Sequence, residues 1–182
     1  MKLDNIAINK VTLAQVDDLR KIGQQTFFET FAASNTSADM QKYLAESFSI
    51  EKLSAELSDP DAEFYLATLD GNVIGYLKLN RGQSQTEWQQ GNTLEIERIY
   101  VLQQFHGQQV GQLFYEKALQ IAQQQNADYI WLGVWEENPR AINFYRKNGF
   151  VAFDKHIFRL GNDEQTDIMM KLNLKGQKEP ES

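Results

Sequence analysis

Two segments of the chain carry the side chains whose types and spacing could do chemistry. Residues 94–111 read LEIERIYVLQQFHGQQVG, and residues 138–150 read NPRAINFYRKNGF. The first segment predicts a strand, a loop and the start of a helix. The second predicts an asparagine-capped helix, a turn and another strand. Together they favour a protein that holds a long phosphorylated cofactor along two strands and does chemistry between them.

The loop at 106–111 has the features of a phosphate site. Backbone N–H groups at the start of a helix lack intrahelical partners and carry the positive end of the helix dipole, so they can bind phosphate oxygens. Glycines let the backbone approach a ligand closely. The alternative is that the glycines only make a tight turn between strand and helix. The residues of this loop are His106, Gly107, Gln108, Gln109, Val110 and Gly111.

The strand before this loop carries two acids. Alternate side chains of a regular strand share a face. One face would then carry Glu95, Glu97, Ile99 and Val101, and the other Leu94, Ile96, Arg98 and Tyr100. In a partly buried cleft, either carboxylate could act as general base for an ammonium substrate. The alternative is a solvated strand face whose acids make ordinary ion pairs.

Asn138 and Tyr145 each have a structural and a chemical interpretation. Asn138 precedes Pro139, and asparagine at the N-cap with proline at the first helical position is a favoured helix start. A ligand contact by Asn138 would be additional. Tyr145 could be a helix aromatic that packs in the core. Its phenol, with an ordinary pKa of about 10, also suits a proton donor to a leaving thiolate.

The absence of cysteine restricts the chemistry. It excludes disulfides, thiolate metal sites and a cysteine nucleophile from this sequence. A group transfer must then use another nucleophile or pass directly from donor to acceptor. The two histidines, His106 and His156, cannot form an H-x-x-x-H pair, which disfavours a zinc enzyme. We therefore expect no metal.

Length, charge and hydropathy restrict the class of protein. A chain of 182 residues with 42% hydrophobic residues predicts one globular domain. The net charge of −7 disfavours a nucleic-acid partner and suits cationic small molecules, although it can equally serve solubility alone. No apolar run approaches the ~20 residues of a membrane helix, and the N-terminus lacks the apolar stretch of a signal peptide. We therefore expect a cytoplasmic protein without a membrane partner.

Hydrophobic periodicity predicts the elements that position these side chains. The expected order is β-α-α-α-β-β-β-α-β-α-β-β, an α/β domain with a mixed sheet. The strands fall at 6–11, 64–69, 73–79, 94–101, 129–135, 151–160 and 166–174, and the helices at 12–31, 38–47, 50–57, 110–125 and 139–147. Asp70-Gly71-Asn72 predicts a tight turn. We expect a single domain over residues 1–174 and a flexible tail over 175–182.

The order and separation of these segments resemble the GCN5-related N-acetyltransferase (GNAT) superfamily over nearly the whole chain. The family pattern Q/R-x-x-G-x-G/A falls on residues 106–111. More narrowly, LEIERIY (94–100), IWLGVWE (130–136) and DEQTD (163–167) resemble bacterial PaiA-type spermidine/spermine N-acetyltransferases. The family fold implies a mostly antiparallel mixed sheet flanked by helices. The family pattern N-x-x-A-x-x-F-Y-x-x-x-G-F is met at Asn138, Ala141, Phe144, Tyr145, Gly149 and Phe150.

The resemblance implies acetyl-CoA as cosubstrate and a set of residues that bind it. The strand residues Ile99, Tyr100 and Val101 would pair through their backbone with the pantetheine arm. The 106–111 loop would cradle the pyrophosphate, and Asn138 would contact the cofactor arm.

The resemblance also implies the catalytic groups. Tyr145 would protonate the departing CoA thiolate, and a glutamate of the preceding strand would act as base, often through water. Glu95 has the more usual spacing from Val101, whereas Glu97 lies closer to the pantetheine-binding segment, and the choice between them stays open. The amine would attack the thioester directly in a ternary complex.

The chain departs from the family pattern at two positions. His106 replaces the usual glutamine or arginine, and Gln109 replaces the first glycine. Neither substitution removes a backbone N–H, so the loop can still cradle a phosphate. Gln109 must, however, take up its conformation without the freedom of glycine. We expect an effect on cofactor affinity rather than on cofactor identity.

The narrower resemblance implies a polyamine, spermidine or spermine, as the acetyl acceptor, and the net acidity agrees. Other functions stay open: acetylation of another small amine or of a protein N-terminus, or a non-catalytic acyl-CoA-binding regulator. The oligomeric state, monomer or homodimer, stays open too. Candidate acceptor elements, which could instead be exposed turn carboxylates, are residues 27–31 with Glu29, and the 161–167 loop with Asp163, Glu164 and Asp167.

Overall fold

The computed structural model describes residues 3–176, without the side chains of residues 158 and 160. The predicted order of elements is confirmed. The predicted tail falls largely outside the described residues. The strands are β1 (Ile6–Lys10), β2 (Ala62–Leu69), β3 (Asn72–Arg81), β4 (Thr93–Val101), β5 (Tyr129–Trp135), β6 (Val151–Leu160) and β7 (Asp163–Asn173). The helices are α1 (Val16–Phe31), α2 (Ser37–Ser47), α3 (Ile50–Ser58), α4 (Val110–Gln124) and α5 (Pro139–Lys147).

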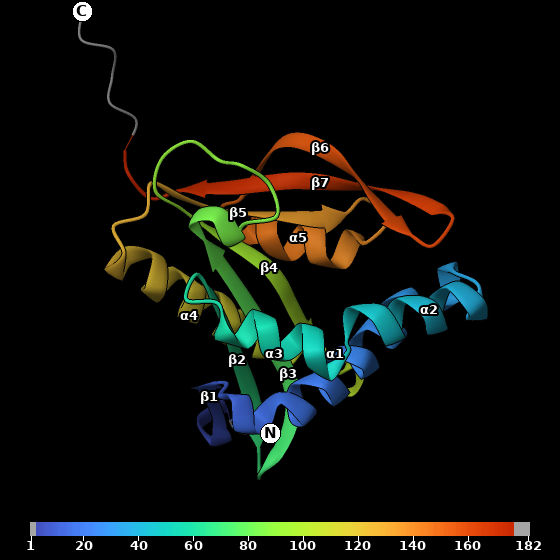
Figure 1. The fold of residues 1–182 in the computed structure, drawn as a ribbon. Helices are drawn as coiled ribbons and strands as arrows, with labels where there is room; N and C mark the ends of the chain where they lie inside the picture. Colours follow the sequence, from blue (N-terminus) through green and yellow to red (C-terminus); the bar gives the residue numbers. More distant parts are fainter. Residues whose placement is uncertain (1–2, 177–182) are drawn as a thin grey trace, which may run out of the picture.

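The described strands form one sheet in the order β1-β2-β3-β4-β5-β7-β6. β4 and β5 are parallel, and every other neighbouring pair is antiparallel. The mixed, mostly antiparallel sheet predicted from the sequence is therefore confirmed. Figure 1 shows β6 and β7 at one end of the molecule and β1 to β3 at the other, with α1 to α3 grouped together.

Most helix and turn boundaries follow from local side-chain chemistry. Thr36 and Ser49 cap α2 and α3, because each hydroxyl accepts the backbone N–H three residues on. The Asn138 side chain does the same for α5. Asp70 and Gly71 have φ angles of 50° and 79°, as the two-residue turn between β2 and β3 requires. The predicted tight turn and helix cap are confirmed.

The C-terminal hairpin is tighter than the sequence predicts. The strand pattern implies a loop over 161–165, but β7 begins at Asp163, which pairs with Leu160 of β6. Gly161 has a φ of +61°, a conformation that glycine adopts without strain. The chain therefore reverses within two residues, and the polar residues that follow already belong to the strand.

Hydrophobic side chains pack on both faces of the sheet. On one face, α4 and α5 cover a cluster that includes Phe114 and Leu132. On the other, α1 to α3 cover a cluster that includes Phe48 and Phe64. Each fully buried side chain of this size contributes ~1.5–3 kcal/mol relative to exposure. The two clusters hold the sheet between its helices, and the site lies at the middle strands.

A β-bulge at Glu97 interrupts the alternation predicted for β4. The register of β3 against β4 skips this residue. Ile96 and Ile99, three positions apart, consequently pack in the same hydrophobic cluster on the α4 side. The prediction that Ile99 and Val101 share a face with the two glutamates is wrong, because the extra residue of a bulge moves the following side chains to the opposite face.

The polar loop between β3 and β4 is fixed to the sheet by hydrogen bonds. Gln85 Oε1 accepts from Thr93 Oγ1 at 2.7 Å and from Trp131 Nε1 at 2.8 Å. Thr86 donates both its backbone N–H and its hydroxyl to Glu95. Figure 1 shows this loop, in green, arching at the β6–β7 end of the sheet. It therefore covers part of the sheet that α1 to α3 leave open.

Candidate active site

β4 and β5 pair only over their N-terminal ends. Their parallel ladder ends with Glu95 opposite Trp131. Beyond this pair the two strands separate, leaving a gap in the sheet that we call the splay, between residues 96–101 of β4 and 132–135 of β5. The edges of the two strands that face the splay have no strand partner there, so they can pair with an extended ligand.

A cleft of about 780 Å³, the larger cleft, opens beside the splay against α4 and α5. This volume lies within the usual range of small-molecule sites. The structure thus brings the predicted pantetheine segment and the predicted phosphate loop together. The predicted cofactor residues that line the cleft are Ile99, Val101, His106, Gly107, Gln109, Val110 and Gly111.

The loop before α4 presents backbone N–H groups to the larger cleft. Gly107 and Gln109 have φ angles of 76° and 63°, so the chain turns sharply into the helix. Among the described residues, the backbone N–H groups of Val110, Gly111 and Gln112 have no hydrogen-bond acceptor. Unpaired donors at a helix N-terminus suit the oxygens of a diphosphate.

Two cations of α5 line the same cleft. Arg140 and Lys147 lie across it from the loop. The His106 Nε2 atom lies 2.8 Å from the Val101 carbonyl oxygen and 3.3 Å from Arg140 Nη2. Burial lowers the pKa of His106, so the ring is neutral at pH 7 and Nε2–H donates to the carbonyl. The positive charge beside a bound phosphate therefore comes from Arg140 and Lys147.

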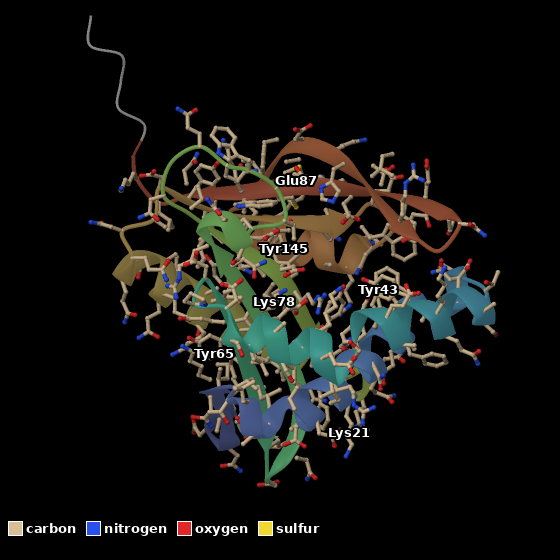
Figure 2. The ribbon with its side chains drawn as sticks, viewed as in Figure 1. Lys21, Tyr43, Tyr65, Lys78, Glu87 and Tyr145 are labelled. Carbon is tan, nitrogen blue, oxygen red and sulfur yellow. The ribbon has the colours of Figure 1, made fainter. Side chains whose placement is uncertain are left out.

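A second cavity, of about 240 Å³, lies on the α1 side of the splay, and we call it the smaller cavity. Ile99, Ala141 and Tyr145 line both this cavity and the larger cleft, so the two meet at these residues. Figure 2 shows Tyr145 near the centre of the molecule. The aromatic walls of the smaller cavity include Phe27, Phe31, Tyr43 and Trp135. Its acidic, basic and imidazole side chains are Glu95, Glu97, Arg98, His156 and Asp167.

Tyr145 is a buried phenol at the junction of the two cavities. The residue is 7% exposed. Its ring packs edge-on against Phe144 and Phe150, with centroid distances of 5.2 and 5.6 Å. Burial raises the pKa of the phenol, so the hydroxyl stays protonated across the physiological range. A protonated phenol in this place can give a proton to a group on either side of the junction.

Glu95 is a buried carboxyl that holds the polar loop. It is 2% exposed and accepts hydrogen bonds from Asn80 Nδ2 at 2.9 Å and from the Thr86 N–H at 2.8 Å. The Thr86 hydroxyl is its third donor. Burial raises the pKa of Glu95, and its hydrogen bonds oppose this. A raised pKa suits a base, but three of its roughly four acceptor positions are already used.

Glu97 is paired with buried cations. Its Oε2 atom lies 2.5 Å from Lys78 Nζ and accepts from Asn80 Nδ2 at 2.8 Å. Lys78 also contacts Glu56 at 3.1 Å. Although burial alone would raise the pKa of Glu97, the charges of Arg98 and Lys78 hold it below its ordinary value. Glu97 is therefore an ionised carboxylate whose charge is already compensated.

Three predicted cofactor residues lie away from the larger cleft. Tyr100 and Asn138 line the smaller cavity instead. Gln108 lines neither cavity, and its side chain donates to the Gln104 carbonyl at 3.1 Å. A contact of Gln108 with a ligand in the larger cleft would thus involve its backbone.

The predicted acceptor elements are only partly brought together. Phe27, Phe31 and Asp167 line the smaller cavity. Glu29 lies outside it and accepts the Gln103 backbone N–H at 2.8 Å. The other two predicted acids of the C-terminal hairpin are exposed: Asp163 is the first residue of β7, and Glu164 pairs with Arg159 at 2.7 Å.

Sequence reasoning missed several residues that line the cavities or compensate their charges. Gly133 of β5 carried the clearest signal, because a glycine inside a buried strand often marks a close approach of other groups. Lys78, Arg140 and His156 carried no local signal, since their partners are distant in sequence. Within residues 3–176, no group of three histidine, aspartate or glutamate side chains is arranged to hold a metal ion, and no helix is both long and apolar enough to cross a membrane.

Comparison with protein families identifies the fold independently. Residues 19–150 match the model of the acetyltransferase (GNAT) family. The chain is also 37% identical over 172 residues to an uncharacterised N-acetyltransferase encoded in the pepI 3′ region of Lactobacillus delbrueckii subsp. lactis. That alignment covers 94% of this chain and 99% of the relative.

Two further similarities involve proteins of Thermoplasma acidophilum. Its spermidine N(1)-acetyltransferase is 24% identical over 154 residues, which cover 82% of this chain and 91% of that protein. The crystal structure of its PaiA N-acetyltransferase in complex with coenzyme A has a TM-score of 0.75, at 23% identity, over 92% of this chain and 98% of that one. At this identity the structural likeness establishes the fold.

Proposed function

The chain belongs to the acetyltransferase (GNAT) family and is an acetyl-CoA-dependent N-acetyltransferase, and we propose that its acceptor is a primary amine of a polyamine, spermidine or spermine. The observation that supports this most is the meeting of the larger cleft and the smaller cavity at Tyr145. A donor in the cleft and an amine in the cavity would react across this junction. Holding both reactants in place can supply ~7–11 kcal/mol of the barrier reduction.

On the donor side, acetyl-CoA supplies an acetyl group activated as a thioester. The free edge of residues 99–101 would pair with its pantetheine arm, and Asn138 would contact the arm near the junction. The unpaired N–H groups at the start of α4 suit the pyrophosphate, and Arg140 and Lys147 would neutralise its charge. The hydrogen-bond donors and cations of the larger cleft thus fit a long ligand with one phosphorylated end.

At the junction, Tyr145 would donate the proton that the departing thiolate needs. Its raised pKa keeps the proton available until a strong base forms beside it. Backbone N–H groups near Val101 would polarise the thioester carbonyl, which favours the charge that develops on oxygen. Direct attack of the amine fits a chain that has no cysteine to carry an acyl group.

Glu95 and Glu97 stay the candidate bases that the sequence predicts, and their surroundings differ. Glu95 has a raised pKa but is engaged with the polar loop. Glu97 is ionised but bound to Lys78. Glu95→Gln and Glu97→Gln, measured separately, would identify a catalytic base by a change in the pH dependence of kcat/KM, because loss of a base removes one limb of that profile.

On the acceptor side, a polyamine suits the lining of the smaller cavity. Aromatic walls can pack against its methylene segments, and Asp167 offers a carboxylate to an ammonium group. Burial raises the pKa of Asp167, while His156 opposes this. The net charge of −7 would attract a polycation. The relative named spermidine N(1)-acetyltransferase supports the same acceptor class.

Another small amine or a protein N-terminus is the second candidate acceptor. The small volume of the smaller cavity, about 240 Å³, favours a small molecule over a peptide segment. A regulator that binds acyl-CoA without catalysis would have no use for a buried phenol at the junction, so Tyr145 disfavours that function.

Release of CoA thiol tests the acceptor. The protein is incubated with acetyl-CoA and, separately, with spermidine, spermine, an aminoglycoside, free amino acids and a short peptide. We expect the highest kcat/KM with a polyamine. A higher kcat/KM with the peptide or with an amino acid would refute the polyamine proposal and keep the acetyltransferase activity.

A further inference from the structure

A histidine and two carboxylates form one cluster at the wall of the smaller cavity. Nε2 of His156, on β6, lies 3.5 Å from Asp167 Oδ2 on β7. Nδ1 of the same ring lies 3.0 Å from Oε1 of Glu87 on the polar loop, close but poorly aligned for a hydrogen bond. His156 and Asp167 line the cavity, whereas the Glu87 side chain is 39% exposed. Figure 2 shows Glu87 at the β6–β7 end of the molecule.

Gly133 of β5 places this cluster at the splay. It follows Trp131, the last residue of β5 that pairs with β4, by two positions. A Cβ atom on Gly133 would lie 3.1 Å from His156 Cε1 and 3.4 Å from Asp167 Oδ2. The missing side chain lets the imidazole and the carboxylate reach the edge of the splay. They therefore share a cavity with Tyr145, the group that faces the donor.

The hydrogen bonds of Glu95 and the ion pair of Glu97 make each of these glutamates a poor proton acceptor. Glu95 already accepts three hydrogen bonds, and Glu97 is bound to Lys78 at 2.5 Å. Histidine, in contrast, is the side chain that takes up and releases protons near neutral pH. Two carboxylates beside its ring nitrogens would stabilise the charged ring.

We propose that His156 accepts the proton which the acceptor ammonium must lose before its nitrogen attacks, and that Asp167 and Glu87 orient the ring and stabilise its charged form. The proposal rests on the proposed function in one respect, that the acceptor arrives as an ammonium group. An N–H bond of the ammonium breaks, its electron pair stays on nitrogen, and the proton moves to the imidazole.

The remaining steps account for the other bonds and protons of the reaction. The amine nitrogen forms the new C–N bond as the C–S bond breaks, and Tyr145 protonates the thiolate. The second proton that nitrogen loses on becoming an amide restores Tyr145. One proton per turnover is thus left over, and His156 passes it to solvent beside the exposed Glu87. Asp167 and Glu87 act on the ring and are positioning residues.

Few charged groups face the imidazole. The polar loop contributes Glu87 and β7 contributes Asp167, while β5 contributes the uncharged Gly133. Across the cavity lie Glu95 and the paired charges of Glu97 and Arg98. The cluster around the ring is acidic, which favours proton uptake from a cationic substrate.

The pH–rate profile of His156→Gln tests the proposal, with spermidine as acceptor, or the fastest amine of the acceptor panel if spermidine is not used. At pH 7 we expect kcat/KM for the amine to fall about 10²-fold or more. The deficit should shrink toward about pH 10, where solvent deprotonates the amine. KM for acetyl-CoA should stay unchanged. Lys155→Gln, at the neighbouring exposed position of β6, is the matched control and should keep the wild-type profile.

The proposal would be overturned if His156→Gln kept the wild-type pH dependence of kcat/KM while Glu95→Gln or Glu97→Gln lost one limb of it. The proposed acceptor would then still stand. If no amine is acetylated, the proposed function fails, and NMR still tests whether Asp167 positions the His156 ring. The chain has only two histidines, so His106→Gln leaves one imidazole signal. We expect the chemical shifts of that signal to change in Asp167→Asn at constant pH, because the carboxylate lies 3.5 Å from Nε2. A signal that Asp167→Asn leaves unchanged would also overturn the proposal.

Discussion

Replacement of Gln109 by glycine measures the strain stored in the loop before α4. Gln109 has a φ of 63° and a ψ of 14°, in the left-handed region. For a residue with a Cβ atom this conformation costs ~1–2 kcal/mol. Glycine escapes that cost but loses ~0.4–1 kcal/mol more conformational freedom on folding. The difference predicts that Gln109→Gly raises the free energy of unfolding by about 0.5–1 kcal/mol.

Urea denaturation and thermal unfolding measure this change in the free energy of unfolding. For a chain of this size, 1 kcal/mol shifts Tm by about 2–4 °C, so we expect Gln109→Gly to melt roughly 1–4 °C higher. Gln108→Gly is the matched control, because the φ of Gln108 is not positive; glycine there adds flexibility and removes one exposed hydrogen bond, to the Gln104 carbonyl. That control should lose ~0.5–1 kcal/mol. Equal destabilisation by both substitutions would show that the loop is not strained at Gln109.

Three further perturbations test other parts of the site. Tyr145→Phe should lower kcat about 10²-fold or more, and calorimetric titration should find the Kd for acetyl-CoA unchanged; an unaltered kcat would remove the general-acid role. Lys78→Met should lower the free energy of unfolding, measured by urea denaturation, by ~3–5 kcal/mol, because it leaves Glu97 buried without its closest cation. A decrease in this free energy of less than about 1 kcal/mol would mean that Glu97 finds another partner. The pKa of Glu97 is held below its ordinary value, so its contribution to stability is full above that value and is lost as pH falls through the lowered pKa. Glu97→Gln should accordingly show less loss of stability between about pH 5 and 3 than the wild type, and parallel curves would contradict this assignment.

Features that depend on neighbouring residues could be predicted from the sequence. The cap at Asn138 and the turn at Asp70 each follow from one or two side chains and the local backbone. The same holds for Gln109, which takes the conformation that its place in the loop demands. The order of strands and helices followed from hydrophobic periodicity for the same reason.

Features that depend on contacts between residues distant in sequence could not be predicted from the sequence. The bulge at Glu97 arises from the pairing of β3 with β4, and nothing in the β4 sequence marks it. The ion pair of Glu97 with Lys78 spans two strands. His156 meets Glu87 only because the polar loop folds back over the sheet. Sequence reasoning therefore predicted many of the residues that line the larger cleft, which lie in two short segments, and few of those that line the smaller cavity, which many separate segments assemble.

Mass spectrometry of the products formed from acetyl-CoA and spermidine tests the central claim most directly. The proposed function predicts singly acetylated spermidine in a one-to-one ratio with free CoA, and a much lower yield of both with Tyr145→Phe. CoA released without acetylated spermidine, or no CoA released with any amine of the panel, would contradict it.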